Sequence, residues 1–297
     1  MNGVLKRYLS DDGSVVCSVL DGTAMIAEME RIHQPSAVMT AAMGRLSMAA
    51  SLIGYGLKSM DDSVTVRIDG GGPGGAVVAV ADYHGNVKCC ADHYIVELPL
   101  NAAGKLDVAG AVGTNGTLYV IKDMGLKEPY VGQTALVTGE IAEDITEYFA
   151  VSEQIPTACG LGVLVDTDLT VKAAGGYLIQ LLPFAEEKSI AQLEQNLAGI
   201  QSITALLSQG LGAEEIAMLL MQGLNANLLD ESTPTYQCDC SRERTARMLA
   251  SLDHAALREM ADEMPEIEVC CHFCSNKYVF TPDEIRAMCH SEIDEDC

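Results

Sequence analysis

The sequence has no tryptophan, only four phenylalanines, and few basic residues. Its 297 residues carry 18 Lys and Arg against 42 Asp and Glu, which gives a formal net charge of -24. A chain this acidic lacks the basic face that binds phosphate backbones, and this excludes DNA or RNA as the main partner. The same charge disfavours docking on anionic membranes. We therefore expect a protein that acts on neither nucleic acid nor membrane.

The sequence also lacks long hydrophobic runs. No apolar segment follows Lys6 and Arg7, as a secretory signal would require. The best candidate for a membrane span, residues 37–57, contains Arg45 and many small residues, and falls short of about 20 strongly apolar residues. We therefore expect a cytoplasmic protein. Structural disulfides are rare in that compartment. Its eleven cysteines, seven of them after residue 230, thus suggest metal binding or redox chemistry.

Familiar catalytic motifs are missing as well. The glycine-rich run at residues 70–75 lacks the Gly-Lys-Ser/Thr ending of a phosphate loop, and a strand follows it, so a hairpin turn is expected. No serine lies in a Gly-x-Ser-x-Gly elbow. Four acidic residues at helical spacing are typical of an exposed helix face: Glu140, Glu143, Asp144 and Glu147. We therefore predict that the protein is not an enzyme.

Strand-like segments dominate the first 183 residues. They cover 4–9, 15–20, 64–68, 76–81, 87–98, 117–122, 134–138, 162–165 and 176–182. A helix is expected at 23–32, and a stronger one after Ser36, where Val38, Ala42, Leu46 and Ile53 recur at helical spacing. This pattern predicts an α+β fold with a mainly antiparallel sheet and packed helices over residues 1–183.

The composition changes after Pro183. Apolar residues then step by three or four between 186 and 207, which predicts one amphipathic helix: Ile190, Leu193, Leu197, Ile200, Ile203 and Leu207. A shorter helix is expected at 213–221, and residues 230–234 are interpreted as a boundary. The predicted division is a sheet domain (1–183), a helical linker (184–232) and a small cysteine-rich domain (233–297). A fold of about 65 residues usually needs a staple such as a metal.

The sharpest motif is Cys238-x-Cys240, thirty intervening residues, then Cys271-x-x-Cys274. Two close cysteine pairs can place four thiolates around one zinc ion, at about 2.3 Å in a tetrahedron. Such a closed set makes the zinc structural and leaves no open catalytic position. The first pair leads into a helix opened by Ser241, and a helix N-terminus favours thiolate over thiol. Two arginines, Arg242 and Arg244, add positive charge nearby.

The ligand register at the second pair has competitors. Cys270 lies beside Cys271 and can form the alternative pair with Cys274. Further possible ligands are His272, Cys289 and His290. We prefer Cys271 and Cys274 because their spacing is that of a zinc knuckle.

Two readings of the cysteine-rich segment remain open. It is either an inert structural zinc domain or a redox switch, since oxidised thiolates lose their metal and a domain folded by zinc then unfolds. In the second case, we hypothesise that the folded tail keeps the preceding amphipathic helix, predicted over 186–207, packed on the core. Its unfolding then frees an apolar surface for unfolded client proteins, formed by Ile190, Leu193, Leu197 and Ile200.

Several segments resemble one family of proteins. They are residues 32–36 (IHQPS), 43–46 (MGRL), 69–73 (DGGGP), 122–130 (KDMGLKEPY), 138–143 (TGEIAE), 152–154 (SEQ) and 175–183 (GGYLIQLLP). With the CxC…CxxC pattern, they make essentially the whole chain similar to the heat shock protein 33 family of redox-regulated holdase chaperones.

The resemblance implies a mechanism. The reduced protein binds one zinc ion through Cys238, Cys240, Cys271 and Cys274 and is a poor chaperone. Oxidants form the disulfides Cys238–Cys240 and Cys271–Cys274, zinc leaves, and the tail and the 184–232 linker unfold. The active form, often a homodimer, holds unfolding clients without ATP and passes them to ATP-dependent foldase chaperones. The extra thiols Cys270, Cys289 and Cys297 depart from the family pattern and leave the exact pairing open.

Two other classes of function make different predictions. A thiol–disulfide oxidoreductase using Cys271 and Cys274 would turn over a disulfide substrate. A constitutive, zinc-stapled interaction protein would gain no binding activity on oxidation.

Overall fold

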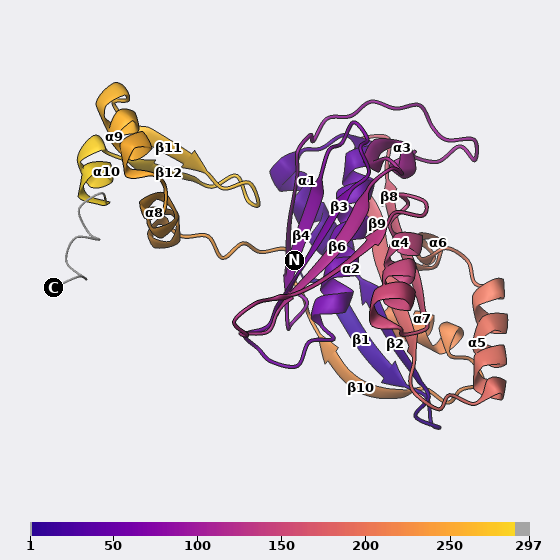
Figure 1. Cartoon of the computed structure of the whole chain (residues 1–297). Helices are drawn as coiled ribbons and strands as arrows, with labels where there is room; N and C mark the ends of the chain where they lie inside the picture. Colours follow the sequence, from indigo (N-terminus) through magenta and orange to yellow (C-terminus); the bar gives the residue numbers. More distant parts are fainter. Residues whose placement is uncertain (1, 289–297) are drawn as a thin grey trace. The chain divides into compact units, whose positions relative to one another are not determined.

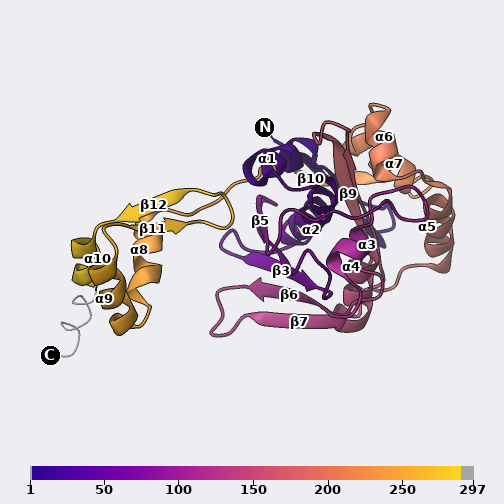
Figure 2. The ribbon, with the colours of Figure 1, turned by 90° about the horizontal axis from the view of Figure 1, so that it is seen from above.

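The computed structural model describes residues 2–288, and these form two compact units that meet between Gln237 and Cys238. Figures 1 and 2 show the chain from two directions. The first unit contains two five-stranded sheets, and the second contains a two-stranded sheet. Every pair of neighbouring strands in these sheets is antiparallel. The predicted α+β class with antiparallel sheets is confirmed.

The first sheet has the strand order β10-β1-β2-β9-β8. Its strands are β1 (Val4–Leu9), β2 (Val15–Asp21), β8 (Thr157–Val165), β9 (Val171–Leu181) and β10 (Asn227–Ser232). A tight hairpin at residues 10–14 joins β1 to β2, and Gly13 there has φ +70°, which glycine adopts without strain. The sheet thus combines the start of the chain with a strand more than 200 residues later.

The second sheet has the order β5-β4-β3-β6-β7. Its strands are β3 (Ser63–Asp69), β4 (Val77–Asp82), β5 (Val87–Ala91), β6 (Thr117–Asp123) and β7 (Tyr130–Ala135). The glycine-rich segment between β3 and β4 is a turn, as predicted. It lies so close to residues 111–113 that a Cβ on Gly70 would approach the Gly113 carbonyl oxygen to 2.1 Å.

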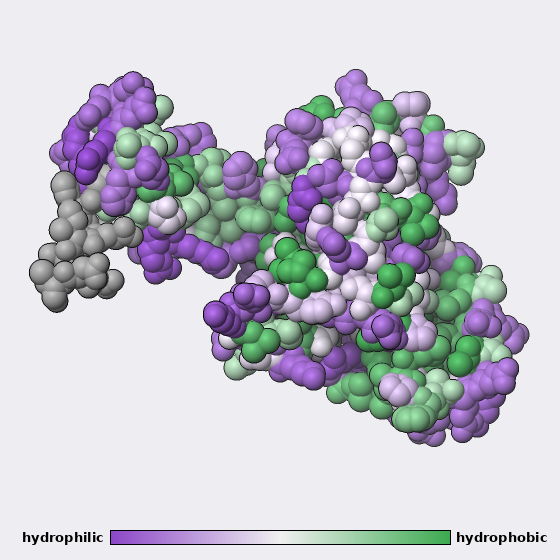
Figure 3. All heavy atoms as spheres, in the orientation of Figure 1, coloured by the Kyte–Doolittle hydropathy of each residue, from purple (hydrophilic) through white to green (hydrophobic). Residues whose placement is uncertain are grey.

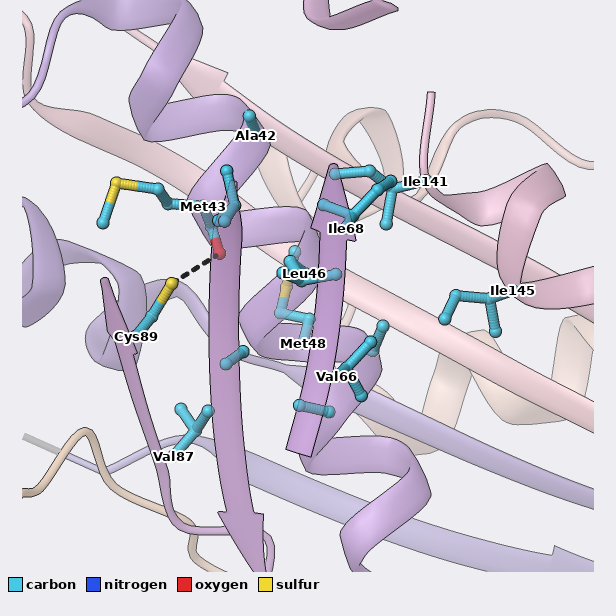
Figure 4. Close-up of a cluster of buried hydrophobic side chains, with 14 of the residues drawn as sticks. Ala42, Met43, Leu46, Met48, Val66, Ile68, Val87, Cys89, Ile141 and Ile145 are labelled. Atoms are coloured by element: carbon cyan, nitrogen blue, oxygen red, sulfur yellow. Dashed lines mark hydrogen bonds between the residues drawn. The ribbon is translucent and has the colours of Figure 1, made fainter. Parts of the chain in front are cut away.

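Helix α2 (Ala37–Gly54) packs against strands of both sheets. It is long and apolar enough to cross a membrane, but it is 89% buried and is therefore a core helix. Figure 4 shows Leu46 and Met48 of this helix near Val66 and Ile68 of β3, and Met43 beside Cys89. Three more helices contact α2: α1 (Thr23–His33), α3 (Val108–Val112) and α4 (Ala142–Tyr148). A π-helical turn, Phe149–Glu153, follows α4.

Three short helices cover the other face of the first sheet: α5 (Glu187–Gly199), α6 (Ile203–Ser208) and α7 (Ala213–Leu220). The prediction of a single helix over 186–207 is wrong, because the backbone is extended at Ile200. Gly199 weakens the helix there, and the Ser202 hydroxyl caps α6 by accepting a bond from the Ala205 N–H at 3.3 Å. A second core forms below these helices, between Leu193, Ile203 and the sheet.

Two strand predictions and one predicted boundary also need correction. The strand expected at 87–98 ends at Ala91, because the Asp92 carboxylate turns back to accept a bond from the Ala76 N–H at 2.8 Å. The strand expected at 134–138 lies earlier, at Tyr130–Ala135. The segment interpreted as a boundary, 230–234, overlaps β10, which completes the edge of the first sheet.

Asp144 on α4 is buried, although an exposed acidic face was expected. Its carboxylate accepts bonds from the backbone N–H groups of Val137, Thr138 and Ile141 at 2.7–3.0 Å. Glu140 forms an ion pair with Arg45. These carboxylates therefore order a loop and hold it on the core.

Tyr236 fixes the end of the first unit. Its side chain is 7% exposed, and its hydroxyl donates to the Cys89 carbonyl oxygen at 2.9 Å and accepts from the Cys89 N–H at 3.1 Å. His33 Nε2 lies 2.9 Å from the same hydroxyl. His33 thus has a structural role, and the chain is anchored two residues before Cys238.

The second unit contains α8 (Arg242–Ala250), α9 (His254–Glu263), β11 (Ile267–Cys270), β12 (Lys277–Phe280) and α10 (Pro282–Met288). Its described core consists of six buried residues: Leu249, Leu257, Ala261, Ile267, Phe280 and Ile285. Residues 184–232 pack within the first unit in this structure. The predicted division into 1–183, 184–232 and 233–297 stays a prediction.

Candidate metal centre

Two short motifs bring four cysteines together in the second unit. Cys238 and Cys240 lie in the extended segment before α8, where the Ser241 hydroxyl caps the helix by accepting from the Arg244 N–H at 3.1 Å. Cys271 and Cys274 lie in the turn between β11 and β12. This turn is closed by bonds from the Cys271 N–H to the Asn276 carbonyl oxygen and from the Ser275 N–H to the Cys271 carbonyl oxygen.

The four sulfur atoms form one compact group. All Sγ atoms of Cys238, Cys240, Cys271 and Cys274 lie within 4.8 Å of one another. The Sγ atoms of Cys238 and Cys271 are 3.7 Å apart, and those of Cys240 and Cys274 are 3.3 Å apart. A zinc tetrahedron with bonds of about 2.3 Å places its sulfurs about 3.8 Å apart. The donor set, four soft sulfurs at these separations, fits one zinc ion.

The thiols differ in how readily they ionise. Partial burial opposes ionisation of Cys240. Hydrogen bonds from the Tyr278 hydroxyl, at 3.1 Å, and from neighbouring thiols outweigh that effect and lower its pKa to about 7. Burial raises the pKa of Cys238 to about 11 and also raises that of Cys274. Cys240 is therefore a thiol that can provide a thiolate near neutral pH.

The two neighbouring arginines contribute less positive charge than expected. Arg244 forms an ion pair with Asp239, and Arg242 forms one with Glu284 at 2.6 Å. The Arg242 guanidinium also lies over the Phe280 ring, 4.3 Å from its centroid. Both arginines thus organise the small unit, and their charges are offset by carboxylates.

Other candidate ligands lie elsewhere or outside the described residues. Cys270 is exposed at the end of β11, and His272 is exposed in the turn. Cys289, His290 and Cys297 lie beyond residue 288. Among cysteines of the first unit, Cys17 and Cys89 are buried core thiols.

The Cys271–Cys274 turn joins two antiparallel strands, so it lacks the βαβ context of a thioredoxin-like motif. Tyr278, which donates to Cys240, is a contributor that the sequence reasoning missed. Its available signal was an aromatic residue in the strand directly after the second cysteine pair.

The four residues expected to bind clients lie on α5 and at its end. Leu193 is 5% exposed and belongs to the second core. Ile190, Leu197 and Ile200 are half-buried, and the last two pack against that core. In this structure, Leu193, Leu197 and Ile200 therefore contribute to the second core.

The chain matches known proteins over almost its whole length. The model of the family described as Hsp33 protein matches residues 4–281. A 33 kDa chaperonin of Agathobacter rectalis is 44% identical over 288 residues, which are 97% of this chain and 100% of that protein. A 33 kDa chaperonin of Clostridium botulinum is 42% identical over 295 residues, 99% of this chain and 100% of that protein.

A solved structure is similar as well. The crystal structure of the 33 kDa chaperonin of Thermotoga maritima superposes with a TM-score of 0.89 at 35% identity, covering 99% of each chain. These similarities identify the fold, and the four-cysteine group lies within the matched part of the chain. The chain belongs to the Hsp33 family, the 33 kDa chaperonins, whose members are chaperones and not enzymes.

Proposed function

We propose that this chaperone is a holdase switched on by oxidation of the four-cysteine group. In the reduced form, Cys238, Cys240, Cys271 and Cys274 would hold one structural zinc ion, which keeps the second unit folded. The observation that carries the proposal is the contrast between this group and the six buried residues around it. A core of that size rarely supplies more than about 3–5 kcal/mol, so loss of the metal would unfold the unit.

The switching chemistry is thiol oxidation. Each disulfide forms when two thiols lose two protons and two electrons to an oxidant such as hypochlorite, which is reduced to chloride while its oxygen and the two protons leave as water. The proposed pairs are Cys238–Cys240 and Cys271–Cys274, as in the family. In the structure, sulfur–sulfur contacts of 3.7 Å and 3.3 Å instead join Cys238 to Cys271 and Cys240 to Cys274. Peptide mapping of the oxidised protein therefore decides between the two pairings.

Unfolding of the second unit would then spread to residues 184–232. Strand β10 ends at Ser232, six residues before Cys238, so disorder in the tail would reach the linker once the Tyr236 anchor between them is released. Release of α5–α7 would expose the apolar side chains of Ile190, Leu193, Leu197 and Ile200 to unfolding clients. The active form is proposed to be a homodimer in the cytoplasm that hands its clients to ATP-dependent foldase chaperones after reduction.

Light scattering from a thermally unfolding client protein tests the switch. Suppression by the oxidised, zinc-free protein and not by the reduced, zinc-loaded protein is the expected result. Equal suppression by both forms would indicate a constitutive chaperone with an inert structural zinc.

Two neighbouring thiols provide a matched pair of variants. Cys271→Ser removes a proposed ligand and should bind zinc poorly and suppress scattering without oxidant. Cys270→Ser removes the adjacent exposed thiol and should retain zinc and the normal switch. Identical behaviour of the two variants would contradict the proposed ligand set.

The client surface has its own test. The double variant Leu193→Glu/Ile200→Glu should lose client binding after oxidation, because two carboxylates would interrupt the apolar stripe. Undiminished binding by the oxidised variant would place the client surface elsewhere.

A further inference from the structure

We propose that strand β1 is a binding site for extended client segments, which add to its edge in place of β10. The inference rests on the proposed release of residues 184–232, to which β10 belongs. Departure of β10 would leave β1 as the edge of the first sheet, with a row of unpaired backbone N–H and C=O groups. Such an edge accepts an extended chain of almost any sequence through backbone hydrogen bonds.

The way β10 is held makes it replaceable. It pairs antiparallel with β1 from Leu5↔Ser232 to Leu9↔Asn227, with an irregularity between Arg7 and Tyr8. Its two leucines contribute little burial, since Leu228 is 49% exposed and Leu229 is 48% exposed. Figure 3 shows apolar atoms on the surface in the lower part of the larger unit, where Figure 1 draws α5 and β10. Backbone pairing and charge therefore hold this strand, rather than a fitted apolar contact.

Charge on β1 adds a preference. Lys6 lies 2.6 Å from a carboxylate oxygen of Glu214 and 3.6 Å from one of Glu231, and Arg7 pairs with Asp230. All three carboxylates belong to the linker, so both cations lose these partners together when the linker is released. Segments that carry carboxylates opposite Lys6 and Arg7 should therefore bind best, although the protein as a whole is strongly acidic.

The sheet face beside this edge becomes available in the same event. Tyr8 and Cys17 are cross-strand neighbours on the face that α5–α7 cover, and both are buried. The Tyr8 hydroxyl is buried without a hydrogen-bond partner among the described residues. Side chains of an added strand alternate between faces. Every second client residue would therefore lie on the apolar face of the sheet that carries Tyr8.

Binding at β1 also explains how clients leave. A client segment and β10 pair with the same backbone groups, so they exclude one another. Refolding of the linker after reduction returns β10 to its register and displaces the client from the edge.

Amide hydrogen exchange of the full-length oxidised protein tests the site. The probe is a synthetic peptide with the sequence of residues 225–234 (NANLLDESTP). Oxidation should expose those amides of residues 4–9 that pair with β10, while the amides that pair with β2 stay protected, and an excess of peptide should restore the lost protection. A control peptide N-methylated at alternate amides keeps every side chain, and it should bind at least about tenfold more weakly because it cannot pair with the edge.

A second control peptide carries lysine in place of the residues matching Asp230 and Glu231. It should bind about three- to tenfold more weakly than the parent peptide. Equal affinity for the parent and the N-methylated peptide would overturn the proposal. It would also be overturned if protection of β1 rose with protein concentration alone and peptide could not compete, because a second copy would then occupy the edge.

A variant separates this inference from the redox switch. Leu228→Pro/Leu229→Pro removes two consecutive N–H groups from β10 and should free the edge in the reduced, zinc-loaded protein. Peptide binding by this reduced variant, with protection of residues 4–9, supports the site even if oxidation fails to release the linker in the natural chain. Absence of binding by a variant whose β10 amides exchange freely overturns the proposal.

Discussion

The two units of this chain differ in what can stabilise their folds, which is apolar burial in the first and a small core beside a four-cysteine group in the second. The first unit, Met1–Gln237, packs a long apolar helix between two sheets and buries a second core below α5–α7. The second unit has a described core of six residues beside four sulfur atoms within 4.8 Å of one another. Burial scales with domain size, so a large unit can rely on it and a unit of about 60 residues cannot.

Under the proposed function, this difference would assign the response to oxidants to the second unit and a stable scaffold to the first. A unit whose fold depends on thiolates responds to oxidants, whereas a unit whose fold depends on apolar burial does not. One chain can therefore lose structure in one part under oxidative stress and keep a stable scaffold in the other.

Removal of zinc should give the largest difference between the units. A strong chelator added to the reduced protein should withdraw about 10 kcal/mol of folding free energy from the second unit. Hydrogen exchange should show loss of protection in α8–α10 and β11–β12, with β2–β9 still protected. Loss of protection in β2–β9 as well, or in neither unit, would contradict the comparison.

A matched pair of core truncations should sharpen it. Leu257 in the second unit and Leu46 in the first are both fully buried. Replacing either by alanine should cost about 2–5 kcal/mol. Leu257→Ala should lower the oxidant concentration needed for chaperone activity, while Leu46→Ala should lower the unfolding midpoint of the first unit and leave that threshold unchanged. Titrations with hypochlorite, followed by client light scattering, measure the threshold.

Asp144→Ala tests the polar part of the first core. It leaves several backbone N–H groups without their acceptor and should cost about 3 kcal/mol. Asp144→Asn retains one acceptor oxygen and should cost less. Thermal unfolding followed by circular dichroism gives both values, and zinc content should stay constant. A loss of zinc would mean that the loop stabilises the second unit too.

The smallest effect is expected where the linker contacts the first hairpin. Hydrogen bonds from Ser10, from Ser189 of α5 and from Ser14 lower the pKa of Asp12. A depressed pKa in the folded state contributes stability at neutral pH, and this contribution is lost only as pH falls below about 4. Asp12 is exposed, so Asp12→Asn should cost about 1 kcal/mol at pH 7. Exchange of α5 amides at pH 7 and pH 3 should show a smaller difference between the variant and the natural chain at the lower pH.

Much of this architecture is predictable from local patterns. Alternating apolar residues predict β3 and β4, and helical spacing after Ser36 predicts α2. The spacing of Cys238, Cys240, Cys271 and Cys274 predicts a metal group because ligand spacing is set by short, local turns.

Other features depend on contacts that no local pattern encodes. The apolar residues keep their helical spacing through residues 200–202, so the pattern alone predicts one helix. The structure has two helices separated at these residues. Strand β10 is polar and exposed, and only its pairing with β1 identifies it as a strand. The burial of Asp144 and the bond from Tyr278 to Cys240 are likewise tertiary, because each joins groups on different segments.

The anchored side chain of Tyr236 has a kinetic consequence. Its hydroxyl is bonded within the first unit only two residues before Cys238, so the first cysteine pair starts from a fixed point. After reduction, regrouping of the four thiols requires closure of the thirty-residue segment between Cys240 and Cys271. Loop closure of this kind is unimolecular, and its entropic cost grows only slowly with length. The half-time for regrouping the thiols should therefore be the same in dilute and in concentrated protein.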